Sequence, residues 1–272
     1  MSSAPRSLVD GVPDELVSIR DRGLQYGDGL FETVRCEHGQ LRWFERHLAR
    51  LVLGCERLGL AAPDGALLRA EAQALIATAP RALVKIILTR GTATARGYRP
   101  AGDERNTRIV SAYDWPAAVS GEFRVGLSSV RLGVNPGLAG IKHLNRLEQV
   151  LAQRAAGQLG LHEVLMSTGA GEVVSGSMCN LFVWRGDALQ TPPVDQCGVA
   201  GVMRSLVLEA AARLGMAVRV EPLPVAALAA VPAMFVTNIR LGVQPVHWYE
   251  GRRLAVDGRG EQLQELIDGT LA

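Results

Sequence analysis

The irregular order of strand-like and helix-like segments is the feature that most constrains the fold of this chain. Runs rich in β-branched residues alternate with helical patterns, but two strand-like runs precede the first long helix. A regular βαβ series would predict a parallel sheet with crossover helices, and this order does not follow one. The sequence therefore predicts an α+β fold.

The first half of the chain contains two predicted helices and three predicted strands. The run FETVRC, after a glycine turn at residues 27–29, is expected to form a strand. From Trp43 the apolar residues recur at helical spacing, and Arg50 falls outside that apolar stripe. A second helix is expected over Asp64–Ala79. The later strands are expected at residues 82–89 and 107–113, with the Gly- and Arg-rich loop of residues 91–106 between them.

The second half repeats the mixed pattern after a polar, proline-containing stretch. We expect a strand at 123–132, an amphipathic helix over 144–160, and a helix starting near Gly201. Further strands are expected at residues 162–168, 179–184, 188–191, 216–223 and 233–238, and a last helix from about Arg259. The predicted organisation is a smaller domain over residues 1–115, a linker at 116–122 and a larger domain over 123–272.

Composition excludes several classes of function. The chain has 272 residues, 48% of them hydrophobic, and a formal net charge of +2 without a dense Lys/Arg run, so nucleic acid is not an expected partner. The apolar stretch Val225–Val236 is too short to cross a membrane, and the N-terminus lacks a secretion signal, which predicts a cytoplasmic protein. Four cysteines and five histidines are scattered, which predicts neither disulfides nor a metal site.

Lys142 is the residue whose setting first indicates chemistry. It follows a Gly/Pro-rich loop and precedes a long helix, where its stem can pack and its amine can lose water. Burial and cationic neighbours such as His143 or Arg146 would lower the pKa of the amine and favour the neutral, nucleophilic form. A solvated loop lysine is the alternative interpretation.

Several segments resemble those of class IV pyridoxal-phosphate proteins. GIKHLNRLEQVLA, which contains Lys142, is similar to the lysine segment of bacterial aminodeoxychorismate lyases, and DRGLQYGDGLFET resembles the family's N-terminal motif. RHLARL, TRGTATARGY, CNLF, CGVAGVMR and FVTN follow in the family order. The resemblance implies a two-domain fold-type IV enzyme, similar to D-amino acid aminotransferase, with pyridoxal 5'-phosphate between the domains.

The resemblance also assigns cofactor-binding roles. It implies that Lys142 forms the Schiff base with the cofactor and moves protons, and that Arg50 in RHLARL binds the cofactor phosphate, which suits its planar fork. Val202 and Met203 in CGVAGVMR would offer N–H groups at a helix N-terminus. Thr237 in FVTN would add a hydroxyl contact to the phosphate. A plain glycine turn and a structural threonine are the alternatives from the residues alone.

Candidate substrate residues lie in three segments. Arg96 and Tyr98 match an R-G-Y element of the lyases, and such an arginine could pair with a substrate carboxylate. Tyr26 and Phe31 belong to the N-terminal motif, whose side chains line the active site in related aminotransferases. Arg240, just after FVTN, is a second candidate for a carboxylate. A solvated arginine and a core phenylalanine are the alternatives.

The sequence departs from the family at one position. Class IV proteins usually carry a glutamate five residues before the asparagine of N-L-F, where it pairs with the protonated pyridine nitrogen, and here that position is Ser175. Glu172 lies three residues earlier, and in a strand that offset reverses the side-chain face unless a bulge intervenes. A serine supplies no counter-charge, so we expect weaker stabilisation of a carbanion and a bias toward elimination.

The implied activity is conversion of 4-amino-4-deoxychorismate, a small-molecule substrate, to 4-aminobenzoate and pyruvate in folate synthesis, by a carbon–oxygen lyase. Two alternatives remain open at this point. One is a class IV aminotransferase acting on D-amino or branched-chain amino acids, and the other is a degenerate relative that binds cofactor without turnover. Family members are typically homodimers, which the resemblance carries over to this chain.

Overall fold

The computed structural model describes residues 6–76, 79–94 and 96–270 and divides into two compact units. The first unit includes the chain up to Ala117 together with Ile141–Asn145, and the second includes Ala118–Gly140 and the chain from Arg146 onward. The segment that carries Lys142 thus belongs to the first unit, whereas the sequence analysis assigned it to the C-terminal domain. We keep a boundary at 116–122 as a proposal, with this exception.

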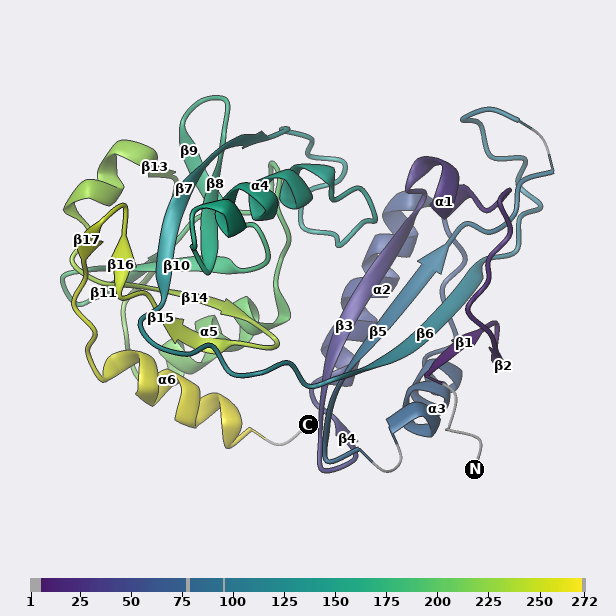
Figure 1. Ribbon diagram of the computed structural model, residues 1–272, viewed down its shortest axis with the longest axis horizontal. Helices are drawn as coiled ribbons and strands as arrows, with labels where there is room; N and C mark the ends of the chain where they lie inside the picture. The colour runs from purple at the N-terminus through teal and green to yellow at the C-terminus, as the bar shows by residue number, and fades with distance from the viewer. Residues whose placement is uncertain (1–5, 77–78, 95, 271–272) are drawn as a thin grey trace. The chain divides into compact units, whose positions relative to one another are not determined.

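The first unit contains one six-stranded sheet with the strand order β2-β1-β6-β5-β3-β4 and two long helices (Figure 1). Its strands are β1 (Ser7–Val9), β2 (Val12–Pro13), β3 (Gly29–Glu37), β4 (Gln40–Leu41), β5 (Arg81–Thr89) and β6 (Thr107–Asp114). Its helices are α1 (Arg22–Tyr26), α2 (Phe44–Leu58) and α3 (Gly65–Ile76). The predicted end of α3 at Ala79 is not reached, and residues 77–78 lie outside the described residues.

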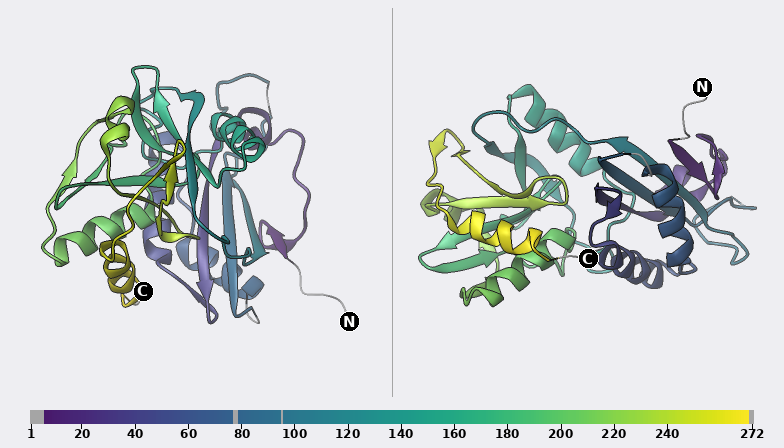
Figure 2. Two further views of the ribbon diagram at one scale, coloured as in Figure 1. Left: turned by 60° about the vertical axis from the view of Figure 1, so that its left-hand side comes forward. Right: turned by 90° about the horizontal axis from the view of Figure 1, so that it is seen from below.

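Alternation along β3 and β5 explains why only one face of this sheet carries helices. Leu30 and Val34 of β3 are buried, as is Ile86 of β5. Their neighbours Phe31 and Lys85 point to the opposite face and are half-buried. Helices α2 and α3 pack on the buried face, against β3 and β6 (Figure 2). The opposite face therefore carries the side chains of Phe31 and Lys85.

Over its described residues, the second unit contains two sheets, three α-helices and one 3-10 helix. One sheet has the order β12-β11-β10-β14-β15 and the other the order β13-β9-β8-β7-β16-β17. The strands are β7 (Arg124–Leu132), β8 (Glu163–Thr168), β9 (Glu172–Gly176), β10 (Asn180–Arg185), β11 (Ala188–Thr191), β12 (Val218–Val220), β13 (Leu223–Pro224), β14 (Met234–Asn238), β15 (Gly242–Pro245), β16 (Trp248–Tyr249) and β17 (Arg252–Arg253). The helices are α4 (Leu147–Gln158), α5 (Val202–Arg213), α6 (Arg259–Asp268) and a 3-10 helix (Val225–Ala230).

The two sheets of the second unit pack face to face. Leu165 of β8 and Val173 of β9 belong to the same buried cluster as Leu181 of β10 and Val236 of β14. Helices α5 and α6 lie side by side next to β14 and β15 (Figure 2). The apolar strands of this unit are thus buried on both faces, which is why their sequences show no alternation.

The prediction for the helix after Lys142 was wrong in its start and in its apolar face. Helix α4 begins at Leu147, not at Leu144, because the residues up to Leu144 pair with the start of β3 through a bridge between His143 and Leu30. Its buried positions are Ala152 and Ala156, while Leu147 is 72% exposed.

The α+β class itself is confirmed. Within the described ranges, no helix has both the length and the apolar character needed to span a bilayer.

Candidate active site

Lys142 lies in a short segment, residues 141–145, that runs beside the start of β3. The N–H of Phe31 donates to the carbonyl of Lys142 at 2.9 Å, and the N–H of Leu144 donates to the carbonyl of Gly29 at 3.0 Å. These two bonds fix the backbone of the segment against the sheet. The lysine is therefore held by a strand and not by the helix that follows it.

The Lys142 side chain lies on the ring of Phe31. Its Nζ atom is 4.4 Å from the ring centroid, within the range of a cation–π contact, and the side chain is half-buried. The Nζ atom of Lys85 is 5.5 Å from the same ring. Lys85 and Lys142 are the only lysines in the chain. The sequence analysis missed Lys85, although a single lysine within an apolar strand was a signal for it.

Arg50 is held by a buried carboxylate from the neighbouring strand. Its Nε and Nη2 atoms donate to the two oxygens of Glu32 at 2.7 and 2.5 Å, and the Nδ1 atom of His47 lies 2.7 Å from Oε2 of Glu32. Glu32 is 1% exposed and His47 2% exposed. One turn of α2 thus presents Arg50 and His47 to the same residue of β3. The bidentate pair fixes the plane of the guanidinium.

The charges in this cluster follow from burial and contact. Burial alone raises the pKa of Glu32, but the charge of Arg50 and the hydrogen bonds from His47 and Arg50 lower it to about 2. Burial lowers the pKa of His47, and its contact with Glu32 does not fully offset that effect. Within the described part of the chain, His47 Nε2 is buried and has no hydrogen-bond partner. The cluster is therefore an anionic glutamate, a cationic arginine and a neutral histidine.

In the second unit, the N-terminus of α5 and the end of β14 form one locality. Asn180 of β10 is the register partner of Thr237 of β14. A Cβ atom on Gly201, the N-cap of α5, would lie 2.1 Å from Oδ1 of Asn180, so the helix starts directly beside this strand pair. The predicted phosphate residues Val202, Met203 and Thr237 are thus brought together.

This locality fits a phosphate group on two observations. The first backbone hydrogen bond of α5 runs from Ser205 to Gly201, and no side chain caps the helix, so the N–H groups of Val202 and Met203 have no intrahelical acceptor. Among the described residues, Thr237 Oγ1 is buried without a hydrogen-bond partner. A buried hydroxyl without a partner is costly unless a ligand completes it.

Replacing Thr237 by valine separates a ligand role from a structural one. In the absence of cofactor, the free energy of unfolding should stay the same or rise by about 1 kcal/mol, because the variant removes an unsatisfied buried hydroxyl. The dissociation constant for pyridoxal phosphate should rise by about tenfold, because a hydrogen bond to a charged group is lost. Urea unfolding and absorbance titration measure the two quantities.

Thr191→Val is the matched control, because Thr191 is equally buried but its Oγ1 donates to the carbonyl of Leu181 at 2.8 Å. It should lower stability by about 1 kcal/mol and leave cofactor affinity unchanged. If Thr237→Val destabilises the cofactor-free protein as much as Thr191→Val does, the Thr237 hydroxyl makes a structural hydrogen bond, which contradicts its assignment to the phosphate.

Ser175 is buried near the end of β9, and a bulge in this strand changes the argument about Glu172. Ser175 pairs with Met166, but the next pair is Val173 with Ser167, so Val174 is the extra residue. The bulge removes the face reversal that counted against Glu172. Glu172 is nevertheless exposed and lies at the far end of β9. Ser175 Oγ donates to the carbonyl of Gly176 at 2.8 Å.

A buried carboxylate that the sequence analysis missed fixes the turn after Ser175. Glu163 of β8 is 1% exposed and accepts hydrogen bonds from the N–H groups of Ser177 at 3.0 Å and Met178 at 3.2 Å. The side-chain amide of Gln153 in α4 donates to it at 3.1 Å. These bonds hold the connection between β9 and β10. Glu163 is a charged residue in a predicted apolar strand, which was a signal for it, but its partner Ser177 lies fourteen residues away and could not be predicted locally.

The predicted substrate residues occupy three different settings. Arg96 and Tyr98 lie in the exposed part of the loop between β5 and β6, and the ring of Tyr98 contacts that of Tyr26 edge-on at 5.4 Å between centroids. Phe31 lies under Lys142 and is not a core residue. Arg240 follows β14, where its N–H donates to Oδ1 of Asn238 at 3.0 Å. Their roles toward a substrate stay predictions.

Residues 29–249 match the family described as amino-transferase class IV, and the chain belongs to that family. It is 32% identical to an aminodeoxychorismate lyase of Vibrio harveyi over 97% of this chain and 98% of that protein. It is similar to the crystal structure of 4-amino-4-deoxychorismate lyase from Pseudomonas aeruginosa, with 39% identity, a TM-score of 0.90 and coverage of 96% and 97%. A D-alanine aminotransferase of Listeria innocua is 25% identical over 91% of this chain and 87% of its own length.

Proposed function

We propose that the chain is a pyridoxal-phosphate-dependent lyase that converts 4-amino-4-deoxychorismate to 4-aminobenzoate and pyruvate. The observation that carries this proposal is the Lys142 amine on the Phe31 ring, in a chain that is 32% and 39% identical to two such lyases over nearly its whole length. The class IV aminotransferases share the fold, and the segment around Lys142 favours the lyase.

The cofactor, when bound, supplies an aldehyde for an amine and a ring that withdraws electrons. Arg50, the N–H groups of Val202 and Met203, and the hydroxyl of Thr237 are the groups that would hold its phosphate. The two hydrogen bonds with Glu32 already fix the orientation of the Arg50 guanidinium. Arg96, Arg240 and Lys85 are the cations that we assign to substrate carboxylates, Lys85 because its ammonium lies near the same ring as Lys142.

Lys142 performs the proton transfers. In its neutral, unprotonated form the Lys142 amine takes the proton from the amine-bearing carbon of the substrate ring. The bond between the ring carbon and the enolpyruvyl oxygen breaks, the oxygen leaves with the electron pair and is protonated, and the ring becomes aromatic. The Lys142 amine is also the group that would replace the product amine on the bound cofactor and so release 4-aminobenzoate. Aromatisation supplies driving force, so this reaction asks less of the cofactor as an electron sink than transamination does.

Ser175 fits an elimination enzyme for this reason. Its hydroxyl hydrogen is directed at the carbonyl of Gly176, and a serine carries no negative charge to balance a protonated pyridine nitrogen. Glu172, which could supply that charge, is exposed at the other end of the strand. We infer that the missing counter-charge lowers transaminase activity and leaves elimination intact.

Ser175→Glu should restore the counter-charge. We expect side transaminase activity with a keto-acid acceptor to rise at least severalfold and the absorption spectrum of the bound cofactor to shift, because a carboxylate favours the protonated pyridine nitrogen. Ser175→Ala, which removes the hydroxyl without adding a charge, is the control and should show neither change. Identical spectra for wild type and Ser175→Glu would contradict the assignment.

The proposed function is tested by incubating the protein with pyridoxal phosphate and enzymatically generated 4-amino-4-deoxychorismate. We expect 4-aminobenzoate fluorescence and an equal amount of pyruvate without any keto-acid acceptor. Turnover that requires an acceptor would identify an aminotransferase instead. Binding of the cofactor without product from either assay would identify a non-catalytic relative.

We further propose a homodimer in the cytosol. The resemblance to class IV proteins supports the dimer, and the four cysteines, all buried and free, suit a reducing compartment. Light scattering should give twice the chain mass of 29.1 kDa. A monomer at micromolar concentration would contradict this proposal.

A further inference from the structure

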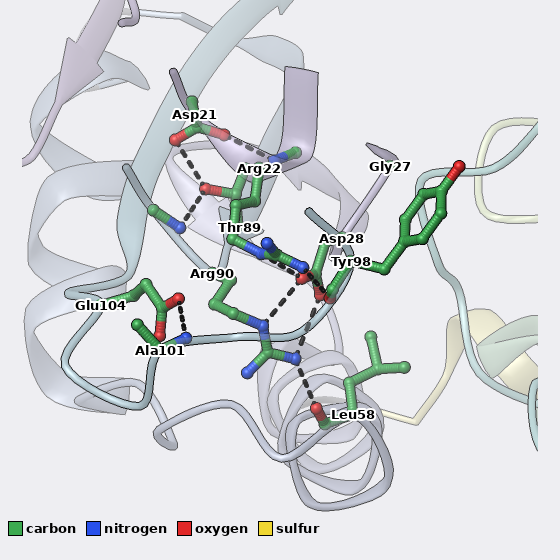
Figure 3. Close-up of polar contacts among 12 residues, drawn as sticks. Asp21, Arg22, Gly27, Asp28, Leu58, Thr89, Arg90, Tyr98, Ala101 and Glu104 are labelled. Atoms are coloured by element: carbon green, nitrogen blue, oxygen red, sulfur yellow. Dashed lines mark hydrogen bonds and ion pairs between the residues drawn. The ribbon is translucent and has the colours of Figure 1, made fainter. Parts of the chain in front are cut away.

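One carboxylate in the first unit binds two guanidinium groups, of which Arg22 is buried and Arg90 is half-buried (Figure 3). Asp28 accepts a hydrogen bond from Nε of Arg22 at 2.9 Å and from Nε of Arg90 at 2.8 Å. The side chains of Arg22 and Arg90 are only 4% and 13% exposed. Burial alone raises the pKa of Asp28, but its hydrogen bonds with the two arginines lower it below the ordinary value. The cluster is therefore charged and, with two cations to one anion, has donors left for backbone carbonyls.

The two arginines use their remaining donors on different parts of the chain. Arg22 donates to the carbonyls of Gly97 at 3.0 Å and Tyr98 at 2.7 Å. Arg90 donates to the carbonyls of Leu58 at 2.6 Å and Gly59 at 2.9 Å, at the end of α2. Arg90 thus stabilises a helix C-terminus, which suits a cation. Arg90 is itself the first residue after β5, but only Arg22 of the pair donates to the Gly97–Tyr98 part of the loop between β5 and β6.

Other contacts order this loop near its base. Arg20 donates to the carbonyls of Ala93 and Thr94 at 2.8 and 3.1 Å. Glu104 accepts from the N–H groups of Ala101 and Gly102 at 2.7 and 2.8 Å. Both contacts lie outside the Arg96–Tyr98 segment. The guanidinium of Arg22 therefore anchors the part of the loop that carries the predicted substrate residues.

Arg22 also fixes the aromatic side chains near this segment. Its Cζ atom lies 5.0 Å from the centroid of the Tyr26 ring, and that ring meets the ring of Tyr98 edge-on. Tyr98 is 85% exposed, and its side chain points away from the ion pairs (Figure 3). A largely exposed tyrosine has few contacts of its own to hold it. Its position depends on its backbone carbonyl and on Tyr26, and Arg22 contacts both.

We propose that Arg22 is a positioning residue, which sets Arg96 and Tyr98 for binding a carboxylate-bearing ring substrate by holding the carbonyls of Gly97 and Tyr98. The proposal rests on the proposed function for the identity of that substrate. Lysine cannot replace arginine here, because one ammonium cannot contact Asp28 and two successive carbonyls with the geometry of a planar fork.

Arg22→Lys is compared with Arg90→Lys, which disturbs the same carboxylate without touching the loop segment. Two readouts are used, the steady-state constants for 4-amino-4-deoxychorismate and the rate at which trypsin cleaves after Arg96, which is exposed. Cleavage requires the loop to open, so its rate follows the population of the open loop. Melting temperatures show that both variants are folded. If Arg22→Lys does not fold, Arg22→Gln replaces it, since it keeps one donor and loses the charge.

For Arg22→Lys we expect KM to rise by about tenfold with kcat within about threefold of wild type, and cleavage at the loop to accelerate by about tenfold, because charge-assisted hydrogen bonds are lost. For Arg90→Lys both readouts should stay within about twofold of wild type. Equal cleavage rates in the two variants overturn the anchoring role. Faster cleavage with an unchanged KM overturns the role in substrate binding.

The same design separates this inference from the proposed function. If wild-type protein forms no 4-aminobenzoate, the proposed function fails, and the trypsin comparison still decides whether Arg22 orders the loop.

Discussion

Replacing Lys142 by alanine should lower kcat for 4-aminobenzoate formation by at least about 10⁴-fold, because the same amine serves as nucleophile and as proton acceptor. The free energy of unfolding should change by about 1 kcal/mol, since the side chain is only half-buried and a cation–π contact such as the one with Phe31 is weak. Product fluorescence and urea unfolding measure the two effects.

Lys85→Ala is the matched control, because it removes the other lysine near the same ring. It should raise KM and leave cofactor attachment intact. If Lys142→Ala keeps more than a hundredth of wild-type kcat, or if Lys85→Ala abolishes cofactor attachment, the assignment of the two lysines is wrong.

Replacing Glu32 by glutamine should destabilise the protein by about 3–5 kcal/mol, because it removes the buried negative charge that the Arg50 guanidinium contacts through two hydrogen bonds. Glu32 is 1% exposed, and both of its oxygens are bonded to Arg50. Glu37→Gln is the control, since Glu37 lies in the same strand and pairs with Arg35, but its side chain is 22% exposed. That change should cost about 1 kcal/mol or less. Equal losses in the two variants would contradict the proposed burial of the Arg50 pair.

The pH dependence of stability gives a second test of Glu32. Its pKa is lowered from 4.5 to about 2 on folding, so its contribution is complete above pH 4.5 and is lost as the pH falls toward 2. The loss amounts to about 3 kcal/mol. The lowered pKa of His47 acts in the same direction below its ordinary value of 6.5, because the unfolded state binds the proton more tightly. In Glu32→Gln the decline below pH 4.5 should be smaller by that amount, while Asp28 and Glu37, whose pKa values are also lowered, keep their own contributions.

The sequence predicted elements well where the pattern is local. The stripe in α2 that includes Phe44, Leu51 and Cys55 is buried as its spacing predicts. The start of α4 was predicted wrongly, because the residues before it bond to β3, more than a hundred positions earlier in the chain. The bulge at Val174 also could not be predicted from the local sequence, since it depends on the partner strand. Tertiary pairing overrode local propensity in both cases.

The candidate site divides in the same way. Family order indicated Lys142, Arg50 and Thr237 as candidates. The residues that hold such side chains in place were missed, because their connections are long in sequence. Glu32 lies 18 positions from Arg50, and Arg22 lies 76 positions from Tyr98. A charged residue in a predicted buried strand, such as Glu32 or Lys85, is the one signal that could have found some of them.

The central claim is that residue 142 carries the cofactor, and reduction with borohydride tests it most directly. The protein is loaded with pyridoxal phosphate, reduced, digested with trypsin and analysed by mass spectrometry. We predict the added mass on the peptide of residues 132–146, with the cleavage after Lys142 blocked. Label on Lys85 alone, or no label on either lysine, would contradict the account.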